Sequence, residues 1–172
     1  MNKKLNNKGF SLVELLIALA VSAIVMTVIL ALMGYTSNQM AMTQQKVSIQ
    51  DEAKDILNHI VNYGQEGSSA EWSDSGVKHL IIRNNSDKAA IKRKEVVYWF
   101  IGNEMYFAST EDVNVASLAA DKKHLLGENV EDFICEVKEN SESKTKYITV
   151  DLKMKTEKAN MSCTNNVYLR NQ

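Results

Sequence analysis

The stretch Gly9-Phe10-Ser11-Leu12-Val13-Glu14-Leu15-Leu16 opens an apolar run that continues to Met33. From Phe10 to Met33 the run contains 24 residues, and only four of them are not apolar: Ser11, Glu14, Ser22 and Thr27. At about 1.5 Å of rise per residue, a helix of this length covers about 36 Å, which is enough to cross a hydrocarbon core about 30 Å thick. The run therefore predicts a membrane-spanning helix over residues 10–33.

Glu14 is the anomaly in this run, because a carboxylate in lipid costs on the order of a few kcal/mol and normally requires a partner. The charges outside the run predict its orientation. Three lysines precede it within residues 1–9, and no lysine or arginine follows it before Lys46. This bias predicts that the N-terminus lies in the cytoplasm and that the chain after Met33 lies on the other side of the membrane.

Two simpler interpretations of this N-terminus remain open from the residues alone. Ala18-Leu19-Ala20 fits the small-residue pattern of a signal-peptide cleavage site, but a cut there would leave residues 21–33 as an apolar new terminus. A plain single-pass anchor would tolerate Glu14 near the cytoplasmic interface. Neither interpretation explains why a glycine lies at the junction of the basic leader and the apolar run, with a glutamate five positions beyond it.

Residues 9–16 resemble the processing motif of type IV prepilins and of the related pseudopilins of type II secretion and competence systems. The resemblance implies a leader of residues 1–9, cleavage between Gly9 and Phe10 by a prepilin peptidase, and methylation of the new amino group of Phe10. It also implies that this ammonium meets Glu14 of a neighbouring subunit in a helical filament, where each charge offsets the burial of the other. The implied partners are other pilin subunits, the peptidase and methylase, and the assembly machinery in the membrane.

Apolar residues after Gly34 recur at helical spacing and predict an amphipathic continuation of the helix over residues 34–63. The members of this stripe are Met42, Ile49, Ala53, Ile56, Leu57, Ile60 and Tyr63. Gly64 and the polar residues 65–69 predict the end of the helix and a loop. One unbroken helix over residues 10–63 would be roughly 80 Å long.

Residues 64–172 change to a period of two and predict a head on the outer side of the membrane. The predicted strands are 77–83, 95–101, 104–108, 130–137, 146–154 and 163–169, with loops or short irregular pieces at 73–76, 84–88, 111–123 and 140–144. Gly102-Asn103 suits a short hairpin turn. The predicted fold class is α+β, a long N-terminal helix packed on an antiparallel β-sheet head that has one buried side.

The composition is that of an ordinary globular domain joined to an anchor, with 45% hydrophobic and 24% charged residues. Loss of the leader would leave 17 basic against 21 acidic residues, which argues against binding of nucleic acid. Lys92-Arg93-Lys94, close to Tyr98-Trp99-Phe100, is the one local cluster that pairs basic with aromatic residues. A solvated strand end is the simpler interpretation of that cluster.

The sequence contains no nucleophile elbow, phosphate-binding glycine loop or metalloprotease helix. His59, His79 and His124 are separated by spacings that match no metal-ligand motif. We therefore expect neither an enzyme nor a metal or other cofactor.

Cys135 and Cys163 are the only cysteines, and both fall in predicted strands of the head. Outside the cytoplasm a disulfide between them is permitted, and it would contribute roughly 3–4 kcal/mol of stability. The alternative is a pair of buried thiols, since Cys135 shares a strand face with Phe133 and Val137 and packs as a small apolar residue in either state. Both alternatives stay open without knowledge of the strand pairing.

Two features bear on the kind of pilin that the resemblance implies. The helix-bending proline of many major pilins corresponds to Ala31 here, and the chain contains no proline. Residues 167–171 resemble the final strand of minor pilins of the PilW type and of pseudopilins of the J type. The resemblance therefore implies a minor pilin that enters or initiates a pilus filament, with a pseudopilin of a secretion or DNA-uptake system as the alternative.

Overall fold

The computed structural model describes residues 10–84, 95–111, 113–120, 124–141 and 145–170. The chain forms two compact units, which divide between Thr43 and Gln44. The long helix α1, Leu12–Glu66, contributes to both units. It confirms the helix predicted over residues 10–63, with a start two residues later and an end three residues later.

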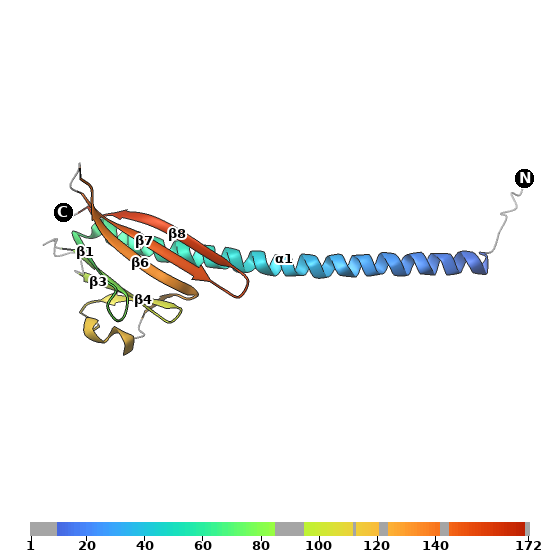
Figure 1. Ribbon diagram of the computed structural model, residues 1–172, viewed down its shortest axis with the longest axis horizontal. Coiled ribbons are helices and arrows are strands. Elements are labelled where there is room, and N and C mark those ends of the chain that lie inside the picture. The colour runs from blue at the N-terminus through green and yellow to red at the C-terminus, as the bar shows by residue number, and fades with distance from the viewer. Residues whose placement is uncertain (1–9, 85–94, 112, 121–123, 142–144, 171–172) are drawn as a thin grey trace, which may run out of the picture. The chain divides into compact units, whose positions relative to one another are not determined.

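The second unit contains two antiparallel sheets (Figure 1). One sheet has the strand order β1-β2-β3-β4-β5 and the other has the order β6-β7-β8. The strands are β1 Ser69–Ser73, β2 His79–Arg83, β3 Glu95–Ile101, β4 Glu104–Ser109, β5 Leu125–Gly127, β6 Val130–Glu139, β7 Lys146–Lys155 and β8 Asn160–Tyr168, and a short 3-10 helix, η1, covers Val115–Ala120. The α+β class and the six predicted strands are confirmed, whereas β1 and β5 were not predicted and the single expected sheet is in fact two.

The five-stranded sheet is buried on both faces, which corrects the expectation of one buried side. One face joins the main core, and the other packs under the segment that contains η1. Trp99 and Val97 on β3 are fully buried on this second face, against Leu118 of η1. Burial on both sides explains the continuous apolar run Val96–Ile101, because alternation in a strand requires one face in water.

The hairpin between β3 and β4 forms at the predicted place. Gly102 has a positive φ of 64°, and Asn103 does not. This pattern is that of a II′ turn, in which the first central residue needs the freedom of glycine. The carbonyl of Asn103 accepts a hydrogen bond of 3.0 Å from the amide of Val130, so the turn also meets the start of β6.

The three-stranded sheet has one buried face, as the alternation of residues 146–154 predicted. Ile148, Val150, Leu152 and Met154 on β7 are all fully buried. Val167 on β8 and Phe133 on β6 extend this face into the main core. The outer face carries hydrogen-bonded polar side chains, including Thr149 with Asn166 at 3.0 Å.

The C-terminal half of α1 supplies the centre of the main core. Its buried residues recur at spacings of three and four and form one stripe: Ile49, Ala53, Ile56, Ile60 and Gly64. The stripe is shorter than predicted, because Met42 is 45% exposed. Gly64 is required by packing, since a Cβ at this position would overlap the side chain of Val167 on β8.

Two polar side chains of α1 bind loops of the head. Oε1 of Gln45 accepts hydrogen bonds from Oγ1 of Thr156 at 3.0 Å and from the amide of Lys158 at 3.1 Å, both in the turn between β7 and β8. The carboxylate of Glu52 accepts from the amide of Glu128 and from Nδ2 of Asn129, just before β6. These contacts complement the apolar stripe, because they bind polar groups of two loops to the helix.

An ion pair joins the two sheets. Nζ of Lys78, the residue before β2, donates to Oδ1 of Asp132 on β6 at 2.8 Å. The hydrogen bond from Lys78 holds the pKa of the Asp132 carboxyl below its usual value, and the same bond raises the pKa of Lys78. The stabilisation is therefore present between the ordinary pKa values of the two groups. It is lost as pH falls through the lowered pKa of Asp132, and as pH rises through the raised pKa of Lys78.

Replacing Lys78 by methionine is expected to lower the free energy of unfolding by about 0.5–1 kcal/mol at pH 7, since the partners are only partly buried. The difference from the parent should shrink as the pH falls through the lowered pKa of Asp132, because protonation of that carboxyl removes the ion pair. Urea unfolding over a series of pH values from 7 downward measures it. Lys155→Met is the matched control, because its pair with Glu131 lies within one sheet and its side chain is 61% exposed. Equal losses for the two variants would contradict the role of Lys78.

Candidate functional site

The helix that carries the predicted site begins with a side-chain cap. Ser11 lies just before α1, and its Oγ accepts a hydrogen bond of 3.2 Å from the amide of Glu14. The carbonyl of Ser11 also accepts from the amides of Glu14 and Leu15, at 3.1 and 3.2 Å. Ser11 was not among the predicted site residues, although Ser-x-x-Glu is the sequence signature of such a cap. The cap fixes the first turn of α1, and with it the position of Glu14.

The hydroxyl groups farther along the apolar run are bonded within the helix itself. Oγ of Ser22 donates to the carbonyl of Ala18 at 2.7 Å, and Oγ1 of Thr27 donates to the carbonyl of Ile24 at the same distance. Hydroxyls bonded in this way do not need a partner from the surroundings. Ser22 and Thr27 are therefore compatible with an apolar environment.

The carboxylate of Glu14 has no hydrogen bond or ion pair with any residue that the structure describes. It lies in the first turn of α1, where the positive end of the helix dipole favours a negative charge. Phe10 lies two residues before the helix and is 78% exposed. Gly9 and the rest of the predicted leader lie outside the described residues, as does the predicted cleavage bond on its glycine side.

The run from Phe10 to Met33 exposes its entire apolar surface. Within the described part of the chain, α1 is the one helix that is long and apolar enough to cross a membrane by length and composition. An exposed apolar surface of this length needs lipid or other protein chains around it. Glu14 is the single ionisable side chain on that surface.

Comparison with known families gives one match, to the family described as the prokaryotic N-terminal methylation motif, over residues 4–30. Neither the curated proteins nor the solved structures gave a match. The matched residues include the predicted cleavage site, Ser11, Glu14 and most of the apolar run.

The motif and the fold together support a precursor of the type IV pilin-like class. The motif points to a structural subunit rather than an enzyme, and it implies processing by a prepilin peptidase and assembly into filaments. The exposed apolar half of α1 fits anchoring in a membrane before assembly. The matched segment does not distinguish a pilin from a pseudopilin, because it ends before the head begins.

The two cysteines are free in the structure, and strand order explains why. Cys135 on β6 is opposite Val150 of β7, and Cys163 on β8 is opposite Leu152 of β7. With β7 between them and an offset of two residues along it, the two cysteines are more than about 10 Å apart, which is beyond the span of a disulfide. Burial raises the pKa of the Cys135 thiol well above its usual value and raises that of Cys163 less strongly. The strand order therefore supports the alternative of two separate thiols.

Alkylation of the folded protein is expected to label Cys163 slowly and Cys135 hardly at all, because Cys135 is only 1% exposed and both thiols resist ionisation. In urea both should react at the rate of an unfolded thiol. Peptide mass spectrometry after timed treatment with N-ethylmaleimide measures the two rates. A disulfide-linked peptide pair in protein isolated from cells without reductant would contradict this assignment.

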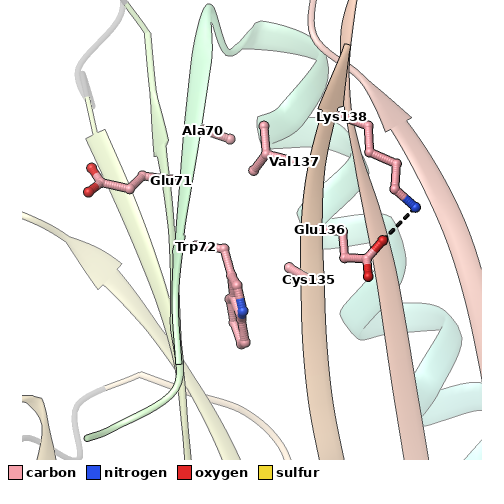
Figure 2. Close-up of a pocket in the computed structure, with 7 residues that line it drawn as sticks. All are labelled: Ala70, Glu71, Trp72, Cys135, Glu136, Val137 and Lys138. Atoms are coloured by element: carbon pink, nitrogen blue, oxygen red, sulfur yellow. Dashed lines mark ion pairs between the residues drawn. The ribbon is translucent and has the colours of Figure 1, made fainter. Parts of the chain in front are cut away.

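A pocket of about 500 Å³ lies between β1 and β6, which are edge strands of the two sheets (Figure 2). Figure 2 shows Ala70 and Trp72 of β1 and Val137 of β6 beside the space between the strands, with Glu71 on the far side of β1. Glu136 and Lys138 form an ion pair of 2.5 Å on β6. The rings of Trp72 and Phe133 are 5.4 Å apart and join the two sheets. The pocket is thus a seam between the two sheets, and its lining includes the buried thiol of Cys135 and the ion pair of Glu136 and Lys138.

Two of the three histidines, His59 on α1 and His124, contact the same ring, that of Phe107, and His79 lies on β2. Nδ1 of His59 is 3.0 Å from the hydroxyl of Tyr98, and Nδ1 of His79 is 2.8 Å from the carbonyl of Val77. The ring of His124 packs against Phe107. No group of three metal-binding side chains occurs within the described ranges. The basic cluster Lys92-Arg93-Lys94 lies outside those ranges.

Proposed function

We propose that this chain is a minor type IV pilin of the PilW-like kind. The precursor inserts once into the cytoplasmic membrane with its N-terminus in the cytoplasm, a peptidase cuts it between Gly9 and Phe10, and Phe10 is methylated. The mature subunit then joins a pilus filament or initiates one. The motif match over residues 4–30, the lysines of the leader and the exposed apolar helix support this sequence of events.

Glu14 carries the proposal. It is the one ionisable group on an apolar surface whose hydroxyls are already bonded, and its carboxylate has no partner among the described residues. A carboxylate in that position needs a cation from elsewhere. Cleavage before Phe10 creates an ammonium at the N-terminus of each subunit, so a neighbour supplies it. Hydrophobic contact alone gives no preferred register, because lipid tails are as apolar as leucine, whereas a charge pair does.

Mass spectrometry of the mature N-terminus tests the proposed processing. The expected terminal residue is Phe10 carrying one methyl group, in material sheared from the cell surface. A terminus at Met1, or one at Val21 after a signal-peptide cut, would contradict the proposal. Gly9→Val, which places a β-branched side chain at the cleavage site, is expected to leave the full precursor in the membrane.

A pseudopilin of a type II secretion or DNA-uptake system is the second candidate, because the N-terminal features are common to both classes. Immunogold labelling separates them. Label on long surface fibres, along the shaft or at the tip, supports a pilin, and label confined to the cell envelope supports a pseudopilin.

A further inference from the structure

The outer edge of β8 carries a row of main-chain groups without partners in the described chain. Hydrogen bonds at both ends of the β7–β8 pair show which residues of β8 bond to β7. The amide of Thr156 donates to the carbonyl of Ala159 at 2.8 Å, and the amide of Leu169 donates to the carbonyl of Lys146 at 3.1 Å. In an antiparallel ladder, alternate residues face the partner strand. The register therefore directs the amides and carbonyls of five residues away from β7: Asn160, Ser162, Thr164, Asn166 and Tyr168.

This edge lacks the usual protection against pairing. Natural edge strands are shortened, kinked by bulges or charged. β8 is nine residues long, and its register with β7 has no shift. It contains no charged residue, proline or glycine, whereas β6, the other edge of the same sheet, has a register shift next to Val130 and five charged residues. The sheet thus presents one edge open to another strand.

The inner face of β8 is also incomplete. Met161 and Cys163 pack against the main core but are only partly buried, while their cross-strand neighbours Met154 and Leu152 are fully buried. A strand added at this edge would cover both side chains and satisfy the outward main-chain groups together. We propose that β8 is the docking edge for an extended segment of a different protein in the same assembly, bound by β-strand addition.

A second copy of this chain does not fit this edge. β1 and β6 face each other across their pocket, and β5 has three residues, so the free edge that a copy offers is its own β8. In a parallel pairing of two β8 strands the second sheet is turned over, so that its largely polar outer face lies beside Met161 and Cys163 and does not complete their apolar row. An antiparallel pairing needs a two-fold axis normal to the sheet. That axis would reverse the direction of the packed helical half of α1 in one copy, whereas subunits anchored in one membrane under the proposed function share a direction. The partner is therefore a different subunit.

The edge also defines the chemistry of the partner segment. The segment must be a polypeptide in an extended conformation. The outward amide and carbonyl of β8 recur at every second residue, about 6.8 Å apart, and the main chain of another strand has the same repeat. The outward side chains of β8 are neutral, so the segment needs no charge to match them. Apolar side chains at alternate positions would extend the partly covered row of Met161 and Cys163.

Thr164→Pro is the decisive variant, because it removes an outward amide and leaves the ladder to β7 intact. Thr164→Val is its matched control: it also loses the side-chain hydrogen bond to Asp151 but keeps the amide. Cys163 is the reporter. The rate at which N-ethylmaleimide alkylates Cys163 is measured in intact cells and after detergent solubilisation, and the two rates give one ratio for each protein. The mature N-terminus is analysed in the same samples.

The parent and Thr164→Val are expected to show Cys163 at least about tenfold protected in cells, and Thr164→Pro to lose that protection. Equal ratios for the proline and valine variants, or a parent whose Cys163 reacts equally fast in cells and in detergent, would overturn the proposal. The choice of a different subunit as the partner rests on the proposed function, but separate measurements test the proposed function and the docking edge. An unmethylated Phe10 refutes the pilin assignment, and the Cys163 ratios still decide whether β8 is covered.

Discussion

Replacing Glu14 by alanine is expected to yield a protein that is inserted and cleaved but is lost from filaments. Under the proposed function, the carboxylate of a neighbouring Glu14 offsets burial of the ammonium of Phe10 in the parent. Without that carboxylate, each incoming subunit would bury an uncompensated charge, which costs about 3–5 kcal/mol. A loss of that size lowers the association constant for the contact by more than about a hundredfold. The ratio of mature protein in sheared filaments to that in membranes measures the effect.

Ser22→Ala is the matched control for this experiment, because it removes a polar group from the same apolar surface and its hydroxyl is bonded only to the carbonyl of Ala18. It is expected to enter filaments as the parent does. Glu14→Gln separates charge from size, and it should fail as alanine does. If the alanine variant joins filaments at the parental level, the charge pair does not drive docking.

Ile56→Ala is expected to give the largest loss of stability in the head. Ile56 is fully buried at the centre of the stripe on α1, and it packs so closely on β5 that a Cβ on Gly127 would lie 2.6 Å from its Cδ1. Truncation of such a side chain leaves a cavity and lowers the free energy of unfolding by about 3–4 kcal/mol. Urea unfolding followed by tryptophan fluorescence measures it, since both tryptophans, Trp72 and Trp99, lie in the head.

Val47→Ala is the control on the same helix, since Val47 is 48% exposed. Its loss should stay within about 0.5 kcal/mol. A loss for Ile56→Ala of the same size as that for Val47→Ala would show that the helical half contributes little to the core. Both measurements use the full chain in detergent micelles, so that the exposed apolar half of α1 remains covered.

Periodicity in the sequence was sufficient to predict the helix and six of the eight strands. β7 shows why, because Ile148, Val150, Leu152 and Met154 face the core at strict alternation and the residues between them face water. The two missed strands carry little local signal. β1 is the polar segment Ser-Ala-Glu-Trp-Ser, and β5 has three residues. Pairing with β2 and β4 makes them strands, and this information lies elsewhere in the chain.

A local sequence pattern could not predict the division into two sheets, because that division depends on which strands pair. Phe133 and Trp72 have similar apolar character, yet they lie on edge strands of different sheets. The same limit applied to the cysteines, whose separation by β7 follows from strand order. Of the proposed assembly site, Phe10 and Glu14 stay predictions, since their partners belong to other molecules. Ser11 was predictable from its spacing to Glu14 and was missed.

The closing contacts of the core come from opposite ends of the head. Val167 and Leu169, near the C-terminus, pack against Gly64 and Gly67, where the helix gives way to the first strand. Under the proposed topology the chain crosses the membrane from its anchor outward, so Val167 and Leu169 emerge after the rest of the core. The head would then stay incomplete until these residues have crossed, and the unfinished chain is the form that chaperones and proteases outside the cytoplasm would meet.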